Sequence, residues 1–416
     1  MGQLSSVDLS AELIYGTPMR LFVKKIFQGI NRNIVAISLV SFLNDISSEM
    51  IYPVVPIFLV TVLNAPMTIV GLIEGIAEST AGILRVFSGY FSDRSGRRKA
   101  FMTGGYILSA MSKPIIAAAS GWALVMGGRF LDRFGKGVRT SARDALLAGV
   151  SEERHRGRVF GFHRALDTLG AMTGPLIAFF LLKVFENNLR FIFYLAFLPA
   201  VAGVALLVVF VRDVKSTHGT RKRPIWRLRD VKLSGNFKVF LSASTVFALG
   251  NSSDAFIILR AHSLGFTLGT TILVYALFNI VYAVFSFPAG IISDRVGQKK
   301  VLLWGFALFA LIYFLFGITS KPAFLWALFP LYGIYMALTE GIGKAYISLH
   351  TKGEFAGTTY GIYQTVTGLA TFPASLAAGF LWRYVNPGAP FFFGAAMALA
   401  ALIIFAMARK EITETG

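Results

Sequence analysis

The 416-residue sequence contains no cysteine and only five histidines. A disulfide framework and a thiolate metal site are therefore excluded, and the histidines do not have the spacing of a zinc site or a catalytic triad. A glycine-rich phosphate-binding loop followed by Lys-Ser or Lys-Thr is also missing, so nothing indicates ATP-driven work. We therefore expect no cofactor, no bound metal and no enzymatic activity.

Charged residues are scarce as well. They make up 15% of the chain, whereas 55% is hydrophobic, and the mean hydropathy is +0.65. A soluble globular chain rarely has this balance. Because a helical crossing of a bilayer takes roughly 20 residues, the sequence predicts an all-α polytopic membrane protein with room for about twelve crossings.

The net charge of +19 could indicate a nucleic-acid partner or a membrane topology. The position of the basic residues distinguishes the two. They cluster in short loops that alternate with loops free of Lys and Arg at 63–67, 117–121 and 385–389. This asymmetry follows the positive-inside rule. We therefore expect no nucleic-acid partner, a location in the inner (cytoplasmic) membrane, and cytoplasmic N- and C-termini.

Apolar runs between glycine, proline and charged breaks predict twelve membrane-spanning helices. They cover residues 34–62, 68–91, 99–117, 121–148, 158–185, 189–212, 237–262, 266–293, 299–319, 323–350, 355–385 and 389–408. The first and the eleventh run are longer than a flat bilayer needs, so these helices must tilt or protrude.

The spans divide the chain into two halves with polar segments around them. Residues 1–30 are too polar and interrupted for a cleavable signal peptide, so we expect the first span to act as the uncleaved insertion signal. The predicted parts are a cytoplasmic, basic amphipathic N-terminal segment (1–33), a six-helix bundle (34–212), a basic cytoplasmic linker (213–236), a second six-helix bundle (237–408) and a cytoplasmic tail (409–416).

An Asp-Arg-x-Gly turn occurs after the second helix of each half, about 200 residues apart. The first copy reads G-Y-F-S-D-R-S-G-R-R-K over residues 89–99, and the second reads G-I-I-S-D-R-V-G-Q-K-K over residues 290–300. Because each half contains an even number of helices, both copies have the same membrane orientation. A parallel repeat of this kind is typical of transporters.

The two six-helix halves, the basic central loop and the doubled loop motif resemble the major facilitator superfamily over essentially the whole chain. More narrowly, residues 44–49 (N-D-I-S-S-E) and 132–137 (D-R-F-G-K-G) resemble a poorly characterised prokaryotic subgroup. The resemblance implies a secondary transporter that works by alternating access and functions as a monomer. Its implied partners are the lipid bilayer, protons and a small-molecule substrate.

In that family the loop motif acts as a gate latch. Its residues here are Gly89, Asp93, Arg94, Gly96 and Arg97, and in the second copy Gly290, Asp294, Arg295 and Gly297. The resemblance implies that Arg97 bridges Asp144, at the inner end of the fourth helix, when the cytoplasmic side is shut. In the second half Gln298 and Lys344 stand at the corresponding positions, so Asp294 would instead meet Lys344. The alternative is that these charges only cap helices and fix topology.

Ionisable residues concentrate in the predicted first, second, fourth and fifth helices. A charge at the bilayer centre costs a few kcal/mol or more, so this concentration indicates a wet cavity with counter-charges. The proton-coupling candidates are Asp45, Glu49, Glu78, Asp132 and Asp167. The substrate-cavity candidates are Arg129, Arg133, Lys136, His163, Asp254, Asn279 and Tyr363. A rigid network of mutually neutralising ion pairs is the alternative.

The fifth helix contains Gly161, Gly170, Gly174 and Pro175 at the spacing of the antiporter motif of drug and metabolite exporters. That motif ends in Gly-Gly, where this chain has Ala178-Phe179. The similarity implies export. Generic close packing of small residues in membrane helices is the alternative.

These observations favour a proton-coupled secondary active transporter that exports a small amphiphilic, anionic or zwitterionic organic solute. A first alternative is transport of a metal or metal chelate, with Asp45, Glu49, His163 and Asp167 as ligands. A second is transport of lipid or lysolipid, for which a lateral opening lined by apolar residues would be the sign. A third is a receptor or scaffold that does not transport.

The latch hypothesis predicts that Asp93→Asn abolishes transport without preventing membrane insertion, because the substitution removes a gating charge but keeps the size of the side chain. Uptake or efflux in reconstituted vesicles measures the first effect, and the yield of monodisperse purified protein measures the second. Unimpaired transport by the variant would contradict the latch.

Overall fold

The computed structural model describes residues 30–95, 97–151, 156–186, 188–213, 233–351 and 356–407. Most of the predicted amphipathic segment, most of the basic linker and the tail lie outside these residues. The helices are α2 (Arg32–Ile51), α3 (Val54–Thr61), α4 (Met67–Ser95), α5 (Arg98–Ala117), α6 (Trp122–Val150), α7 (Arg156–Val184), α8 (Leu189–Phe210), α9 (Gly235–Gly250), α10 (Ala255–Ser263), α11 (Leu268–Val296), α12 (Gln298–Ile318), a 3₁₀ turn (Pro322–Phe324), α13 (Leu325–Leu349), α14 (Ala356–Tyr384) and α15 (Ala389–Ala406).

All twelve predicted spans are helical, and the described part of the chain contains no strand, which confirms the all-α fold class. Nine of the described helical stretches are long and apolar enough to cross a membrane on their own. Helix α6 is not among them because seven ionisable residues occupy one of its faces between Arg129 and Asp144. It therefore depends on its neighbours to occupy the membrane.

Two predicted continuous helices are broken, at corresponding places in the two halves. The first span divides into α2 and α3 at Tyr52-Pro53, where proline lacks the N–H that would continue the helix. The seventh divides into α9 and α10, because the Ser253 side chain accepts from the Ala255 N–H and the Ser253 N–H donates to the Ser375 side chain. Such local bonds compete with the helical ladder. The short segments α3 and α10 pack against each other.

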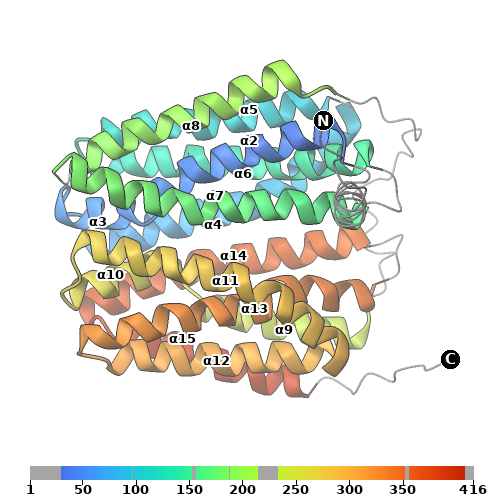
Figure 1. The fold of residues 1–416 in the computed structure, drawn as a ribbon. Coiled ribbons are helices and arrows are strands. Elements are labelled where there is room, and N and C mark those ends of the chain that lie inside the picture. The colour runs from blue at the N-terminus through green and yellow to red at the C-terminus, as the bar shows by residue number, and fades with distance from the viewer. Residues whose placement is uncertain are drawn as a thin grey trace, which may run out of the picture.

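The two halves lie side by side, with α2–α8 in one and α9–α15 in the other (Figure 1). The start of α2 and the end of α15 are at the same end of the bundle, which we call the terminal face. The halves repeat each other's packing: α4 packs on α6 as α11 packs on α13, and α5 packs on α8 as α12 packs on α15. This repetition agrees with the internal duplication.

The halves meet along two helix pairs, α4 with α14 and α7 with α11. Glycines bring the first pair close. A Cβ atom on Gly75 would lie 2.9 Å from the Phe372 carbonyl oxygen, and one on Gly82 would lie 3.2 Å from the Gly368 Cα. Small residues of this kind allow membrane helices to approach at backbone distance.

The glycine of the second Asp-Arg-x-Gly turn has a conformational role. Gly297 joins α11 to α12 with φ +94°, a backbone conformation that side chains with a Cβ rarely adopt. The structure describes neither residue Gly96 nor the side chains of Asp93 and Arg94 in the first copy. The conformation of the Asp-Arg-x-Gly turn is therefore described only in the second half.

Two glycines of the fifth-helix motif pack α7 against α2. A Cβ atom on Gly170 would lie 2.6 Å from the Phe42 carbonyl oxygen, and one on Gly174 would lie 2.8 Å from the Ile46 carbonyl oxygen. A Cβ on Gly161 would meet nothing within 4 Å. The motif therefore joins two helices of the same half.

This contrast predicts that Gly170→Val destabilises the protein by about 1–3 kcal/mol, since the added carbon atoms push α7 off α2. Gly161→Val, the same change in the same helix, should leave thermal stability nearly unaltered. Thermal unfolding of the two purified variants in detergent measures the difference. Equal losses in both would show that helix propensity, and not packing, sets the cost.

Candidate functional site: a charged cavity between the halves

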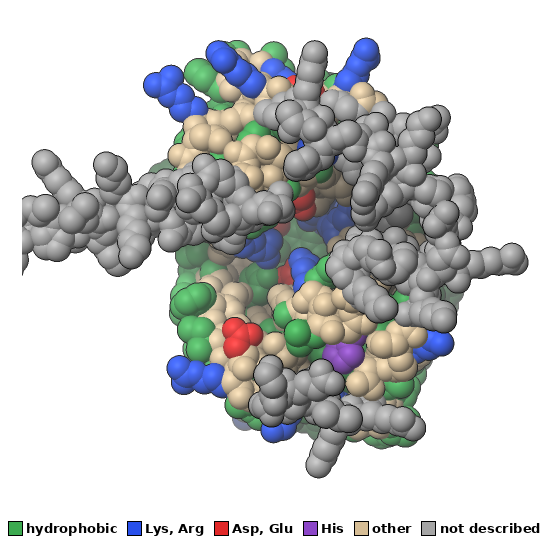
Figure 2. Space-filling model, turned by 90° about the vertical axis from the view of Figure 1, so that its right-hand side faces the viewer, with side chains coloured by type: hydrophobic (Ala, Val, Ile, Leu, Met, Phe, Trp, Pro, Cys, Tyr) green, Lys and Arg blue, Asp and Glu red, His purple; other side chains and the backbone are tan. Residues whose placement is uncertain are grey.

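A cavity of ≈580 Å³ lies between the two halves. This size is within the range of small-molecule sites, roughly 300–1,000 Å³. Helices α2, α4, α6 and α7 line it from the first half, and α11, α13, α14 and the break between α9 and α10 line it from the second. Figure 2 shows a hollow on the terminal face, with Lys, Arg, Asp and Glu side chains inside.

The structure brings most of the predicted residues to this one cavity. The lining includes all five proton-coupling candidates, Asp45, Glu49, Glu78, Asp132 and Asp167. It also includes five of the cavity candidates, Arg129, Arg133, Lys136, Asp254 and Asn279. Tyr363 lines an adjoining pocket, and His163 is buried behind the cavity wall. These positions fit the wet-cavity hypothesis, and the roles of the residues stay predictions.

Helix α6 supplies most of the positive charge because its ionisable residues recur at helical spacing on one face. Arg129 holds Glu74 of α4 with Nη2–Oε2 and Nε–Oε1 distances of 2.6 and 3.0 Å. Arg133 lies 2.9 Å from Glu78, one turn further along α4. Both guanidinium groups also lie over the ring of Tyr52, at 5.4 and 5.5 Å from its centroid. Cation–π contacts of this kind add to the ion pairs.

Sequence reasoning missed Lys113 of α5, which is 0% exposed. Its Nζ lies 2.8 Å from the Asp132 carboxylate and donates to the Ser109 carbonyl oxygen, also at 2.8 Å. Beyond Lys99, Lys113 is the only Lys, Arg, Asp or Glu in the predicted span 99–117. An isolated lysine in an apolar run could have identified Lys113 as part of the charged site, because an intramembrane charge requires a partner.

A second cluster lies nearer the terminal face. Asp167 lies 3.7 Å from Arg143 and 3.7 Å from His163. Arg143 also pairs with Asp144 at 3.0 Å, and the Asp144 side chain is 46% exposed. Arg97 is exposed. The Arg97–Asp144 bridge was predicted for a shut cytoplasmic side, and it stays a prediction for that state.

The second copy of the motif is arranged differently. Asp294 and Arg295 are exposed near the end of α11, and Gly290 has open space around it. Lys344 lines the cavity from α13. Within the described residues no ion pair joins Asp294 to Lys344, so their direct contact also stays a prediction for another state.

Polar side chains also connect the halves. Tyr275 of α11 donates to Glu49 of α2 at 2.9 Å, and Ser253 donates to Glu74 at 3.0 Å. Closer to the terminal face, Arg164 donates to Tyr282 at 2.9 Å. These partners lie on different halves, so no local spacing in the sequence could pair them.

The lining carboxylates divide into two sets. Asp132, Glu78, Asp144, Asp167 and Glu340 each have a cationic side chain within 4.0 Å. Asp45, Glu49 and Asp254 have no such cation among the described residues. Glu49 and Asp254 instead accept from the tyrosine hydroxyls of Tyr275 and Tyr332, at 2.9 and 2.6 Å.

A membrane-spanning bundle of two similarly packed halves, with a charged cavity between them, defines a helical membrane transporter. The chain belongs to the Major Facilitator Superfamily, whose sequence profile matches residues 37–253 and 239–415. The earlier resemblance is confirmed.

Two relatives illustrate the range of the family. The chain is 34% identical over 386 residues to an uncharacterized MFS-type transporter of Methanocaldococcus jannaschii, with 90% of this chain and 95% of the relative covered. It is 23% identical over 394 residues to the quinolone resistance protein NorA of Staphylococcus aureus, covering 92% and 97%.

Solved structures share the fold at low identity. A POT family transporter in complex with 5-aminolevulinic acid superposes with a TM-score of 0.78 at 12% identity, covering 91% of this chain and 96% of that one. A D-xylose-proton symporter superposes with a TM-score of 0.74 at 14% identity, covering 92% and 99%. These similarities establish the architecture alone.

The buried Lys113–Asp132 pair predicts a large effect of Lys113→Met, about 3–5 kcal/mol of lost stability, because the substitution leaves a buried carboxylate without its partner. The double variant Lys113→Met/Asp132→Asn should recover much of the loss, since it removes the buried charge. Thermal unfolding in detergent measures both, with the exposed Lys321→Met as control. A single variant as stable as the wild type would contradict the pairing.

Proposed function

We propose that this protein is a proton-coupled secondary active transporter that exports a small organic solute by alternating access. The observation that carries the proposal is Glu49, a half-buried cavity carboxylate that has no cation within 4.0 Å among the described residues and accepts a hydrogen bond from the opposite half. A proton arriving at such a group changes both its charge and a contact on which the relative position of the halves depends.

The division of the carboxylates supports this choice of group. An ionised carboxylate buried without a counter-charge is costly, whereas one paired with arginine or lysine is compensated. Asp45, Glu49 and Asp254 are therefore the carboxylates that gain most from taking up a proton. The paired Asp132 and Glu78 instead hold the arginines and Lys113 in place. This assignment narrows the five sequence candidates to Asp45 and Glu49, and adds Asp254.

Coupling follows from where these groups lie. When Glu49 is ionised, it accepts from Tyr275 and joins α2 to α11. When it is protonated, the charge that strengthens this bond is gone, and the halves are freer to move against each other. In a transporter of two rocking halves, titration at the interface thus links proton movement to reorientation.

The composition of the cavity supports an anionic, zwitterionic or amphiphilic solute. Most of the basic side chains of α6 are held by acids, but Lys136 lines the cavity with no ion pair among the described residues. The second half contributes tyrosines, Asn279 and Asn251 to the lining. A solute with one charged end and a less polar body would satisfy both sides.

Export is supported by the fifth-helix motif and by the relative whose name records quinolone resistance. The basic loops support a terminal face, and with it an opening of the cavity, on the cytoplasmic side of the inner membrane. Helices of one chain line the cavity on all the sides described, which supports a monomer as the transporting unit.

The alternatives have less support. His163 and Asp167 are close to each other, but no three acidic or histidine side chains among the described residues are grouped to hold a metal ion. A groove of ≈710 Å³, lined mainly by apolar residues, lies between the ends of α3 and α7 and the start of α11. It shares no lining residue with the charged cavity, so it gives no support for lipid entry into that site.

The test uses proteoliposomes with a pH-sensitive dye inside and an imposed pH gradient. Anionic metabolites, cationic drugs, divalent metals and lysolipids are added in turn. We expect an organic solute to trigger proton flux in the wild type, and Glu49→Gln to reduce this flux roughly tenfold or more while solute binding persists.

Glu186→Gln is the matched control, because Glu186 is an exposed residue at the far end of α7. It should behave as the wild type. Full coupling in the Glu49→Gln variant would remove Glu49 from the mechanism. A solute transported at equal rates with and without the gradient would refute proton coupling altogether.

A further inference from the structure

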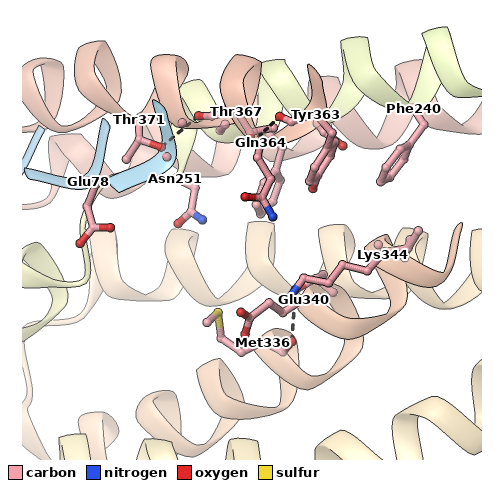
Figure 3. Close-up of a pocket in the computed structure, with 18 of the residues that line it drawn as sticks. Glu78, Phe240, Asn251, Met336, Glu340, Lys344, Tyr363, Gln364, Thr367 and Thr371 are labelled. Carbon is pink, nitrogen blue, oxygen red and sulfur yellow. Dashed lines mark hydrogen bonds between the residues drawn. The ribbon is translucent and has the colours of Figure 1, made fainter. Parts of the chain in front are cut away.

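A second pocket of ≈370 Å³ extends from the charged cavity into the second half. The two spaces share a boundary that includes Glu78, Arg85, Asn251 and Gln364. Figure 3 shows Asn251, Tyr363 and Gln364 projecting into this space from one side, opposite Met336, Glu340 and Lys344. The pocket is therefore a side chamber of the same site.

Aromatic rings form the deep wall of the chamber. Phe240, Phe247, Phe306, Tyr335 and Tyr363 all line it. Phe240 and Tyr363 are stacked at 5.6 Å with an interplanar angle of 5°, and Phe247 and Phe306 at 4.6 Å and 19°. A wall of ordered rings favours an aromatic ligand, because ring contacts add stabilisation beyond the area they bury.

Two buried polar atoms at the boundary lack partners. The Arg85 Nε donor has no hydrogen-bond acceptor within the described residues, and the Asn251 Oδ1 acceptor has no donor. The other end of the Asn251 amide donates to Tyr335 at 3.3 Å. Unsatisfied buried groups are costly, so a rotation of these side chains toward a ligand that supplies an acceptor to Arg85 and a donor to Asn251 is favoured.

The charge left for a ligand is positive. Of the two acids at the boundary, Glu78 is held by Arg133 at 2.9 Å. Glu340 accepts from Tyr282 and lies 3.8 Å from Arg164. Arg85, by contrast, forms no ion pair within 4.0 Å in the described part of the chain. A negatively charged group is therefore the one that completes the site.

We propose that this chamber binds the aromatic ring of an organic acid, with Arg85 holding the acid's anionic group at the boundary with the charged cavity. The proposal rests on the proposed function, because it names the substrate class of that same site. It makes Arg85 and the ring wall the determinants of specificity, and Asn251 the acceptor for a ring hydroxyl or N–H donor.

Gly343 of α13 offers a way to fill the chamber. A Cβ atom there would lie 3.7 Å from the Phe240 ring and 3.8 Å from the Tyr363 hydroxyl, which is ordinary contact distance. A larger side chain at this position would occupy the space for the ligand ring. Gly341, two residues earlier on the same helix, is exposed and would meet nothing within 4 Å, so it provides a matched control.

The experiment measures binding of 1-naphthoate to the purified full-length protein in detergent by titration calorimetry. Cyclohexanecarboxylate tests the need for an aromatic ring, and 1-naphthylmethylammonium tests the sign of the charge. We expect Gly343→Leu and Arg85→Gln each to weaken 1-naphthoate binding about tenfold or more. Gly341→Leu should bind as the wild type does. Gly343→Ala, a smaller filling, should give an intermediate loss and guards against misfolding of the leucine variant.

Several results would overturn the proposal: no saturable 1-naphthoate binding by the wild type, equal binding of the aliphatic acid or the aromatic cation, or full affinity in Gly343→Leu. Because binding is measured without a gradient, it does not depend on proton coupling. Saturable binding with no proton flux in vesicles would refute the proposed function alone. Proton-coupled transport of another solute, without 1-naphthoate binding, would refute the chamber alone.

Discussion

The buried ion pairs that α6 makes with α4 and α5 are the constraint on which the arrangement of the first half depends. Each guanidinium or carboxylate placed at membrane depth must find a counter-charge or water. The charged face of α6 therefore cannot face lipid, and it turns toward Glu74, Glu78 and Lys113. The cavity is the space that this requirement keeps polar. The second half carries few such charges, and rings and hydroxyl groups form its side of the site.

Much of this architecture was predictable because it follows from local chemistry. Apolar length predicted the twelve spans, and the repeated Asp-Arg-x-Gly turn predicted the two similar halves. The gathering of the charges was predictable from the cost of burying them. Their partners were not: Glu49 meets Tyr275 and Glu74 meets Ser253 only after the halves are assembled. The break before α3 could have been predicted from Pro53, because proline interrupts a helix. The break after Gly250 could not, because it depends on a bond to Ser375 in a distant helix.

Two kinds of buried carboxylate thus occur in one cavity. Most of those paired with arginine or lysine lie within the first half and hold its helices together, whereas Glu340 pairs with Arg164 across the halves. Those satisfied by tyrosine hydroxyls lie where the halves meet or where the spans break. The carboxylates that hold helices together are therefore separate from those free to take up a proton. Under the proposed function, this arrangement suits two halves that move as units. The side chamber is lined largely by the second half, so under the proposed function the ligand ring and the proton would occupy different walls of one site.

The paired breaks in the first helix of each half have a mechanical consequence. Beyond each break lies only a short rod, eight residues in α3 and nine in α10, and the two rods touch each other at the end of the bundle away from the cavity mouth. A contact between two short helices can part by tilting at the breaks. The long helices, which carry the ion pairs, need not bend for this, so the contact between α3 and α10 and the charged interior can change independently.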